Sequence, residues 1–261
     1  MNSALMLMLL AATMASAQAC GPHTAALYRY ARFYYDDPRT GPAGIDKDMF
    51  DELARRSGCQ LNQVVESRVR IWQEMRRGTV QLTLSALSSP ERREIAELLP
   101  YAQGRFQLLV RRGLAGRVQS LAAFEADPAL RLVHVRGYVH GPALDPWLQR
   151  LRGQGRLVET ADFETASRML RAGRADALLS LPSSYAFAID GSDHPDNPVP
   201  VDVTPNERSV MSLAMAHAMP EADRQRLRRA LQAMLADGTV HDIMRRHLGD
   251  KGARASAYTG E

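Results

Sequence analysis

The sequence predicts an α/β fold in which helices flank mainly parallel sheets, and two observations carry this prediction. Short apolar runs with strand character alternate along the chain with amphipathic stretches of helical spacing, which is the pattern of repeated βαβ units. The chain has 261 residues, of which 45% are hydrophobic and 24% are charged. This is the composition of ordinary globular proteins, and the length is sufficient for one large or two medium domains.

The first βαβ unit is predicted near the amino terminus. Strands are expected over residues 24–31 and 60–66, with a crossover helix over residues 46–57 between them. Asp46 is expected to cap this helix and Gly58 to end it. Because βαβ crossovers are right-handed, the two strands run parallel and can be neighbours, with their amino ends at the same edge of the sheet.

The chain contains only two cysteines. Cys20 and Cys59 each lie at the amino end of one of these two strands, so their sulfurs can meet. In an exported chain such a pair favours a disulfide. The alternative is two buried free thiols.

The amino-terminal residues have the character of a signal peptide. Residues 1–19 form an apolar run that ends in Ala17-Gln18-Ala19, which fits a small-x-small cleavage site. A mature chain starting at Cys20 and exported to the periplasm is therefore expected, because no later stretch approaches the length of a membrane span. The alternative is lipidation of Cys20, for which Gln18 makes a poor match.

Residues 79–101 combine an apolar strand, a turn and a helix start. Ser88 and Ser89 can cap the helix, and Pro90 suits its first position. The free N–H groups of a helix start, together with the planar guanidinium of Arg92, suit an anion such as a carboxylate. The alternative is a solvated capping box, Ser88 with Glu91, beside an exposed Arg92.

The second half of the chain repeats strand and helix, and this repetition again favours a parallel sheet. Strands are predicted over residues 105–111, 130–135, 157–159 and 175–181. Helices are predicted over residues 142–151, after Asp162, after Pro220 and over residues 239–248, followed by a polar tail.

Composition and spacing exclude several classes of function. The net charge is +4, but the 33 basic residues are spread along the chain and form no nucleic-acid-binding motif. No nucleophilic triad, phosphate loop or metal-ligand spacing is found, so no catalytic residue, metal or cofactor is expected. Asp193, His194 and Asp196 are interpreted as part of a solvated, turn-rich loop.

Four segments, in order, resemble the family 3 periplasmic solute-binding proteins, the amino-acid-binding type that serves ABC importers. SSPER at residues 88–92, with Pro100-Tyr101 after a hydrophobic helix, resembles the family's "TPER … PY". The other three segments are GIDKDMFDELARRSG at 44–58, GRADALL at 173–179 and DGTVHDIMRRHLG at 237–249. Through their order and spacing, the four segments extend the resemblance over nearly all of residues 20–249.

The resemblance implies a two-lobe periplasmic-binding-protein clamp of type II, each lobe a mainly parallel sheet flanked by helices. The expected parts are a signal peptide (1–19), lobe one (20–101 plus 209–250), lobe two (102–208) and a flexible tail (251–261). Such a protein is a monomer that captures a small solute by hinge closure and presents it to an ABC transporter permease, without nucleic acid, membrane insertion or catalysis. The alternatives are a sensor that contacts a receptor kinase, and an enzyme on the same fold resembling cyclohexadienyl dehydratase.

The resemblance also implies where the ligand binds. Arg92, with backbone groups near Ser88, would hold a carboxylate, and an aromatic wall would come from the loop that contains Phe33, Tyr34 and Tyr35. Arg68 stands where relatives often place an aromatic residue. The candidate ligand-binding residues are Arg92, Ser88, Ala86, Arg68, Tyr34, Arg136, Tyr138, His140 and Ser180.

One departure from the family pattern bears on the ligand. Leu181 occupies the position at which relatives that bind amino acids place an aspartate for the ammonium group. An unpaired buried cation is costly, so a carboxylate or another small anion without an ammonium group is expected. The open alternative is that Glu207 or an aromatic cage replaces the missing acid.

Overall fold

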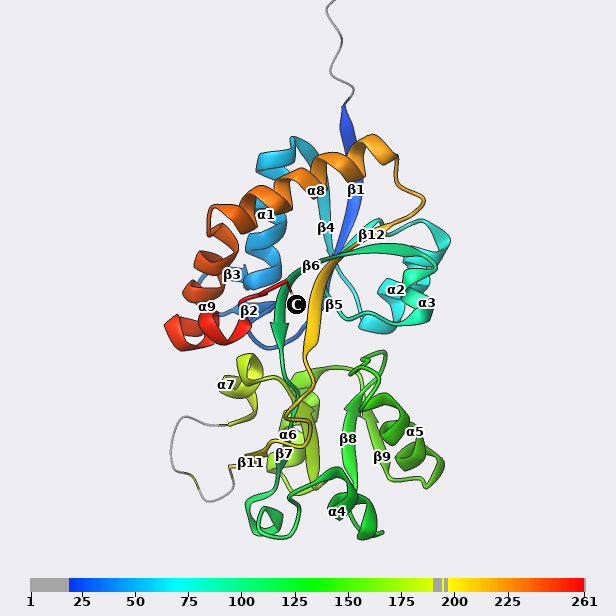
Figure 1. The fold of residues 1–261 in the computed structure, drawn as a ribbon, viewed down its shortest axis with the longest axis vertical. Coiled ribbons are helices and arrows are strands. Elements are labelled where there is room, and N and C mark those ends of the chain that lie inside the picture. Colours follow the sequence, from blue (N-terminus) through cyan, green and yellow to red (C-terminus); the bar gives the residue numbers. More distant parts are fainter. Residues whose placement is uncertain (1–18, 190–193, 195–196, 261) are drawn as a thin grey trace, which may run out of the picture.

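The computed structural model describes residues 19–189, 194 and 197–260, and the account below concerns these residues. Nearly all of the predicted signal peptide, and most of the loop with Asp193 and Asp196, lie outside them. The described chain forms two lobes, each built on a five-stranded sheet with helices packed against it (Figure 1). None of its helices is both long enough and apolar enough to cross a membrane.

The first sheet has the order β4-β1-β5-β12-β6. Its strands are β1 (Cys20–Leu27), β4 (Cys59–Val65), β5 (Leu82–Ala86), β6 (Ala96–Gly104) and β12 (Ser209–Ala216). β1 runs parallel to β4 and β5, whereas β12 runs antiparallel to both of its neighbours, β5 and β6. The helices of this lobe are α1 (Ile45–Ser57), α2 (Arg68–Arg77), α3 (Pro90–Arg93), α8 (Glu221–Ala236) and α9 (Thr239–Ser256). The short strands β2 (Tyr35–Asp37) and β3 (Gly41–Ala43) form a separate ribbon.

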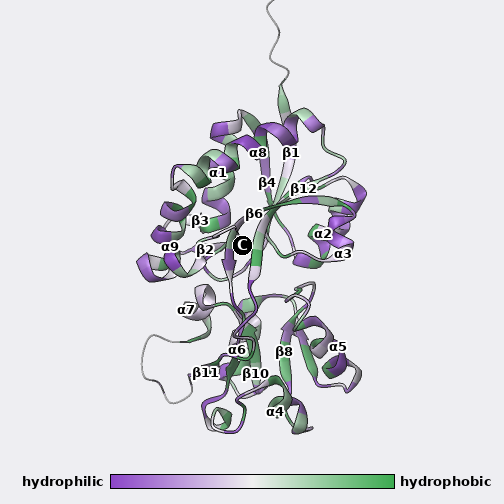
Figure 2. Cartoon of the chain, viewed as in Figure 1, coloured by the Kyte–Doolittle hydropathy of each residue, from purple (hydrophilic) through white to green (hydrophobic). Residues whose placement is uncertain are grey.

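The second sheet has the order β11-β7-β10-β8-β9. Its strands are β7 (Gln107–Val110), β8 (Leu132–Val135), β9 (Leu157–Thr160), β10 (Ala177–Ser180) and β11 (Val199–Val201). Here β7 is the antiparallel member. The helices are η1 (Arg112–Leu114), α4 (Leu121–Ala126), α5 (Asp145–Gly153), α6 (Phe163–Arg171), η2 (Pro182–Ser184) and α7 (Tyr185–Ala188). Figure 2 shows mainly hydrophobic residues along β8, and both hydrophilic and hydrophobic residues along helices such as α8 and α9.

Two stretches of chain connect the lobes. β6 leads into β7, and the segment after β11 leads back into β12, which pairs with β6 along its whole length. Arg105 lies between β6 and β7, and its side chain forms an ion pair with Asp202 at 3.0 Å and donates to the Pro205 carbonyl at 2.8 Å. The two connections are therefore bonded to each other where they pass between the sheets.

Local sequence decides the limits of α1. Its large apolar side chains are fully buried, and Gly58 ends the helix in the left-handed conformation, as predicted. The expected cap at Asp46 is wrong, because the N-cap residue is Gly44, at φ 133°, where a side chain would collide with the Phe33 carbonyl. Asp46 lies one residue inside the helix and is turned into the protein interior.

The stretch after Arg92 differs from the expected helix. α3 is a single turn, and the chain then enters β6, where Leu98 and Leu99 pair with Ala214 and Leu213 of β12. Leucine, alanine and glutamate favour helix locally, but the pairing with β12 places these residues in a strand.

The segment expected as a polar tail is partly packed. α9 continues to Ser256 across a break at Gly249, and Ala253 and Ser256 are buried. Ala257 then forms a bridge with Ala102 of β6. The carboxyl-terminal part of the described chain therefore lies against a strand that leads to the second lobe.

Cys20 and Cys59 form a disulfide, which confirms the pairing predicted from the βαβ unit. The two residues are register partners in the parallel strands β1 and β4, and their Cα atoms lie 4.5 Å apart. No free cysteine remains in the described chain.

Loss of this disulfide is expected to destabilise the first lobe. The bond closes a loop with a sequence separation of 39 residues, for which loop-closure entropy gives up to about 4 kcal/mol. We expect the paired change Cys20→Ser and Cys59→Ser to lower the free energy of unfolding in urea by up to that amount. Intact-mass analysis after alkylation should find no free thiol in the wild-type protein, and an unchanged urea midpoint in the variant would contradict the assignment.

Candidate functional site

A small cavity lies between the two lobes. It is built at the carboxyl ends of strands from both sheets, which is where open α/β sheets generally bind ligands. The lining residues are Tyr28, Tyr30, Arg68, Ser85, Leu87, Arg92, Phe106, Tyr138, Val139, Leu181 and Met211. None of these residues is acidic.

Arg68 is held beneath the end of β5. It is the first residue of α2 and is only 3% exposed. Its guanidinium donates to Thr83 Oγ1 at 3.1 Å and to the Ser85 carbonyl at 3.0 Å, and it lies 4.3 Å from the centre of the Tyr28 ring. These contacts fix the cation at the cavity wall without a carboxylate partner.

Arg92 reaches both lobes. Its guanidinium donates to the Leu87 carbonyl at 2.8 Å and to the Gly137 carbonyl of lobe two at 3.0 Å, and it lies 4.3 Å from the centre of the Trp72 ring. Burial, with the repulsion of Arg68 as the next cause, lowers the pKa of Arg92 to about 9. The side chain therefore stays cationic at neutral pH, in surroundings that disfavour its charge.

Aromatic rings form much of the cavity wall. Tyr138, from the loop after β8, packs edge-on against Tyr28 and Tyr30, with ring centres 5.8 and 5.5 Å apart. Burial raises the pKa of Tyr28 to about 12 and raises the pKa of Tyr138 as well, so both hydroxyls are neutral. The Tyr138 hydroxyl is buried and has no hydrogen-bond partner, which leaves a donor available to a ligand.

Behind the cavity wall, Ser85 connects the site to a buried carboxyl group. Ser85 has φ 51°, and its hydroxyl donates to Asp46 Oδ1 at 2.8 Å. The Tyr101 hydroxyl also donates to Asp46 Oδ1, at 3.3 Å, while Asp46 Oδ2 has no partner. Asp46 is 1% exposed, and burial raises its pKa to about 7. The loss of solvation therefore outweighs both hydrogen bonds and the attraction of Arg68.

The lobes also touch directly beside the cavity. Gly137, at φ 79°, packs on Val69 so closely that a Cβ atom would lie 2.8 Å from Val69 Cγ2 and 2.9 Å from its backbone nitrogen. The Arg92 bond to the Gly137 carbonyl lies at the same contact. The structure is thus a closed form whose lobes meet through protein groups.

The structure brings only part of the predicted ligand set to this cavity. Arg68, Arg92 and Tyr138 line it. Ser88 and His140 line a neighbouring pocket with Glu207, which shares Leu87 and Phe106 with the cavity. The other members lie elsewhere: Ala86 and Ser180 are buried in β5 and β10, Tyr34 is buried in the loop before β2, and Arg136 is exposed.

Of the aromatic residues at the cavity, Tyr138 was predicted, whereas Tyr28 and Tyr30 were not. The loop with Phe33, Tyr34 and Tyr35 was expected to supply the aromatic wall, but the rings that this part of the chain brings to the cavity are Tyr28 and Tyr30. These two directly follow β1, and residues just after a parallel strand lie at the edge of the sheet that binds ligands, so this position was a usable signal. Phe33 instead stacks behind Tyr30 at 5.1 Å.

Leu181, at the position of the family's ammonium partner, lines the cavity and is 2% exposed. Glu207, a possible replacement, lines the neighbouring pocket and not this one. Within the described residues, the cavity thus offers cations and neutral hydroxyl groups but no carboxylate.

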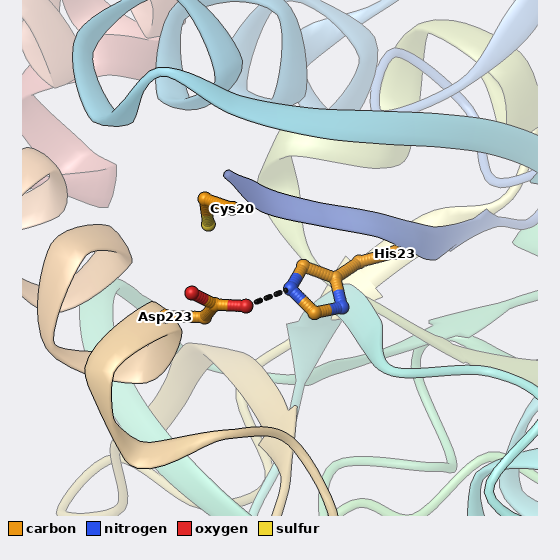
Figure 3. A group of neighbouring side chains, drawn as sticks. All are labelled: Cys20, His23 and Asp223. Carbon is orange, nitrogen blue, oxygen red and sulfur yellow. Dashed lines mark hydrogen bonds and ion pairs between the residues drawn. The ribbon is translucent and has the colours of Figure 1, made fainter. Parts of the chain in front are cut away.

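A second group of polar side chains lies at the opposite edge of the first sheet, where Cys20, His23 and Asp223 approach one another (Figure 3). His23 Nε2 lies 2.8 Å from Asp223 Oδ2. The sulfur of Cys20 is bonded to Cys59 and offers no thiolate, so only two potential ligands remain. This group ties β1 to α8 and is not a metal centre in the disulfide-bonded protein.

Comparison with known proteins gives the family. The family model of the bacterial extracellular solute-binding proteins, family 3, matches residues 24–250. The chain therefore belongs to this family of solute-binding proteins. No curated protein sequence matches the chain.

Solved structures share the type II clamp fold. An ancestral arginine-binding protein bound to arginine has a TM-score of 0.74 and 16% identity, covering 87% of this chain and 97% of that one. A histidine kinase sensor domain has a TM-score of 0.71 and 18% identity, covering 89% and 96%. An ancestral amino-acid-binding protein described as a precursor of cyclohexadienyl dehydratase has a TM-score of 0.70 and 19% identity, covering 87% and 94%. At these identities the likeness establishes the fold alone.

The buried carboxyl group should make stability depend on pH. Because the pKa of Asp46 is raised to about 7, the folded chain keeps a proton that the unfolded chain loses near pH 4. Stability therefore falls as pH rises through this window, by about 1.4 kcal/mol per pH unit, and levels off above the folded pKa. Asp46→Asn should remove this component from urea unfolding measured between pH 4 and 8. Asp51→Asn, on an exposed part of α1, should leave it in place, and identical profiles for both variants would contradict the assignment.

The contact at Gly137 should control closure. Gly137→Ala introduces a methyl group against the Val69 backbone, so the variant should favour an open form with a larger radius of gyration in small-angle X-ray scattering. Gly141→Ala is the matched control, because Gly141 also has a positive φ, 96°, but no atom within 4 Å of its Cβ position. Scattering curves that match between the two variants would show that the contact does not govern closure.

Proposed function

We propose that this protein is a periplasmic solute-binding protein that captures a small carboxylate lacking an ammonium group and presents it to an ABC importer. The observation that carries the proposal is the composition of the cavity between the lobes. Two buried arginines line it, and no acidic residue does. An anion gains charge-assisted hydrogen bonds there, whereas the ammonium group of an amino acid finds no carboxylate partner.

Closure of the two lobes around a ligand is supported by the placement of the cavity-lining residues on both lobes. Arg68, Ser85 and Tyr28 belong to lobe one, while Tyr138 and Val139 come from lobe two. A ligand bound first by lobe one gains its remaining contacts only when the lobes meet, so its binding free energy favours the closed form. An importer that recognises the closed form would then distinguish loaded from empty protein.

A role as the separate sensor partner of a receptor kinase is the second candidate, favoured by the likeness to a histidine kinase sensor domain. Both roles use the same binding step and differ only in the protein that recognises the closed clamp. Catalysis is not proposed. The one carboxyl group near the cavity with a pKa in the neutral range, Asp46, lies behind Ser85 and does not line the cavity.

The experiment is calorimetric titration of protein that has been unfolded and refolded to remove any bound solute. Common L-amino acids are compared with their deaminated analogues and with short dicarboxylates. We expect micromolar binding among the analogues, and Arg92→Ala should weaken it at least about tenfold, since a charge-assisted hydrogen bond is worth roughly 1.5 to 3 kcal/mol.

The matched control is Arg93→Ala. Arg93 is the exposed neighbour of Arg92 and bonds to Ser88. Its loss should change affinity little, and circular dichroism establishes that both variants are folded. Micromolar binding of amino acids with none of the analogues bound would refute the proposal.

A further inference from the structure

We propose that the cavity takes a compact anion with two negative charges, and that Arg68 is a second anchor beside Arg92. This inference rests on the proposed function and specifies the class of solute. The two guanidinium carbons lie 5.3 and 4.3 Å from the centre of the Trp72 ring, so they are at most 9.6 Å apart. A small molecule with two anionic groups, or with one dianionic group, can contact both.

The charge of the two arginines is not matched by the protein. Among the described residues, neither has a carboxylate within the 4.0 Å ion-pair distance, although both are buried. Glu91 and Asp145 attract Arg92 only from beyond that distance. Asp46 attracts Arg68, but its own raised pKa means that it carries only part of a negative charge at neutral pH.

The remaining groups at the two guanidiniums do not supply negative charge either. Tyr28 and Tyr138 are neutral because burial raises the pKa of each. A single carboxylate would therefore leave one buried positive charge largely uncompensated, which is unfavourable, whereas a dianion compensates both.

Another buried arginine has a guanidinium group with more hydrogen bonds to the protein. Arg156 donates to the carbonyl groups of Phe124, Glu125, Asp127 and Leu130 and to the Gln154 side chain. Three of these acceptors lie at or near the carboxyl end of α4, whose dipole favours a cation.

To the described residues, the Arg92 guanidinium donates two hydrogen bonds, to the Leu87 and Gly137 carbonyl groups, although a guanidinium carries five N–H groups. Arg68 makes three, to Thr83, Leu84 and Ser85. Both therefore retain donors beside the cavity, and the unpartnered Tyr138 hydroxyl adds another.

The size of the cavity restricts the anion. In the present closed form it has room for about two water molecules. Tyr138, on the loop that follows β8, must shift slightly to admit a ligand, and only a compact one fits between the tyrosine rings. Short dicarboxylates and inorganic phosphate meet this limit and share the required charge.

The test is titration of refolded protein with matched probes at constant ionic strength and pH 8, where inorganic phosphate is mainly doubly charged. The dianionic probes are malonate, succinate and phosphate, and the monoanionic probes are acetate and butyrate. At least one dianion should bind about tenfold or more tightly than every monoanion, and malonate and phosphate separate the dicarboxylate from the phosphoryl chemistry.

Two variants test whether Arg68 is the second anchor for the anion. Arg68→Met keeps an unbranched apolar side chain against Tyr28 and should weaken dianion binding about tenfold or more, while monoanion binding changes by less than about threefold. Arg136→Met removes an exposed charge from the loop of lobe two and should change neither. Circular dichroism shows whether each variant is folded. The comparison of dianionic with monoanionic probes uses the wild-type protein and does not depend on either variant.

Each result decides the inference. Monoanions that bind as tightly as the best dianion would overturn it and leave the proposed function standing. A folded Arg68→Met protein with unchanged dianion affinity would overturn the role of Arg68. If no dianion binds, the inference is wrong, and binding of monocarboxylates or amino acids to the same preparation then decides whether the proposed function fails as well.

Discussion

The character of the cavity between the lobes depends on two guanidinium groups. Among the described residues, neither has an acidic partner. Arg68 and Arg92 are held by backbone carbonyl groups at the end of β5 and by aromatic faces, and these contacts replace part of the water that each cation has lost. The cavity they line therefore carries positive charge and neutral hydroxyl groups. In the proposed function, such a site would select its ligand first by charge.

In the proposed function, Arg92 would couple ligand binding to the movement of the lobes. Arg92 belongs to lobe one, yet its second hydrogen bond goes to the Gly137 carbonyl in lobe two. A ligand anion that engages this guanidinium would compete for, or add to, a contact that already holds the clamp shut. If the proposed function holds, this one side chain would influence both the affinity for ligand and the balance between open and closed forms.

Sequence patterns were sufficient to predict features that depend on a single βαβ unit. The helix that ends at Gly58 and the pairing of Cys20 with Cys59 both follow from one βαβ unit, and both were predicted. The role of Asp46 was not, because its capping tendency is local while its actual partners, Ser85 and Tyr101, come from β5 and β6. The strand that follows Arg92 was missed for the same reason, since pairing with β12 outweighs local helix propensity.

The candidate site likewise includes residues that the sequence could predict and residues that it could not. Arg92 could be found from its segment and Leu181 from its place after a buried strand, whereas Tyr28 and Tyr30 were passed over for the more conspicuous aromatic run that follows them. The approach of Gly137 to Val69 has no sequence signal, because it depends on how two lobes meet across a hinge.

The packing of the carboxyl-terminal segment has a practical consequence. Ala257 is bonded to Ala102 in β6, one of the strands that lead from lobe one to lobe two. A fluorescent group attached in this segment would lie beside the joint and not at the outer end of a lobe. The segment around Ala257 is therefore a suitable position for an optical reporter of changes in how the two lobes are arranged.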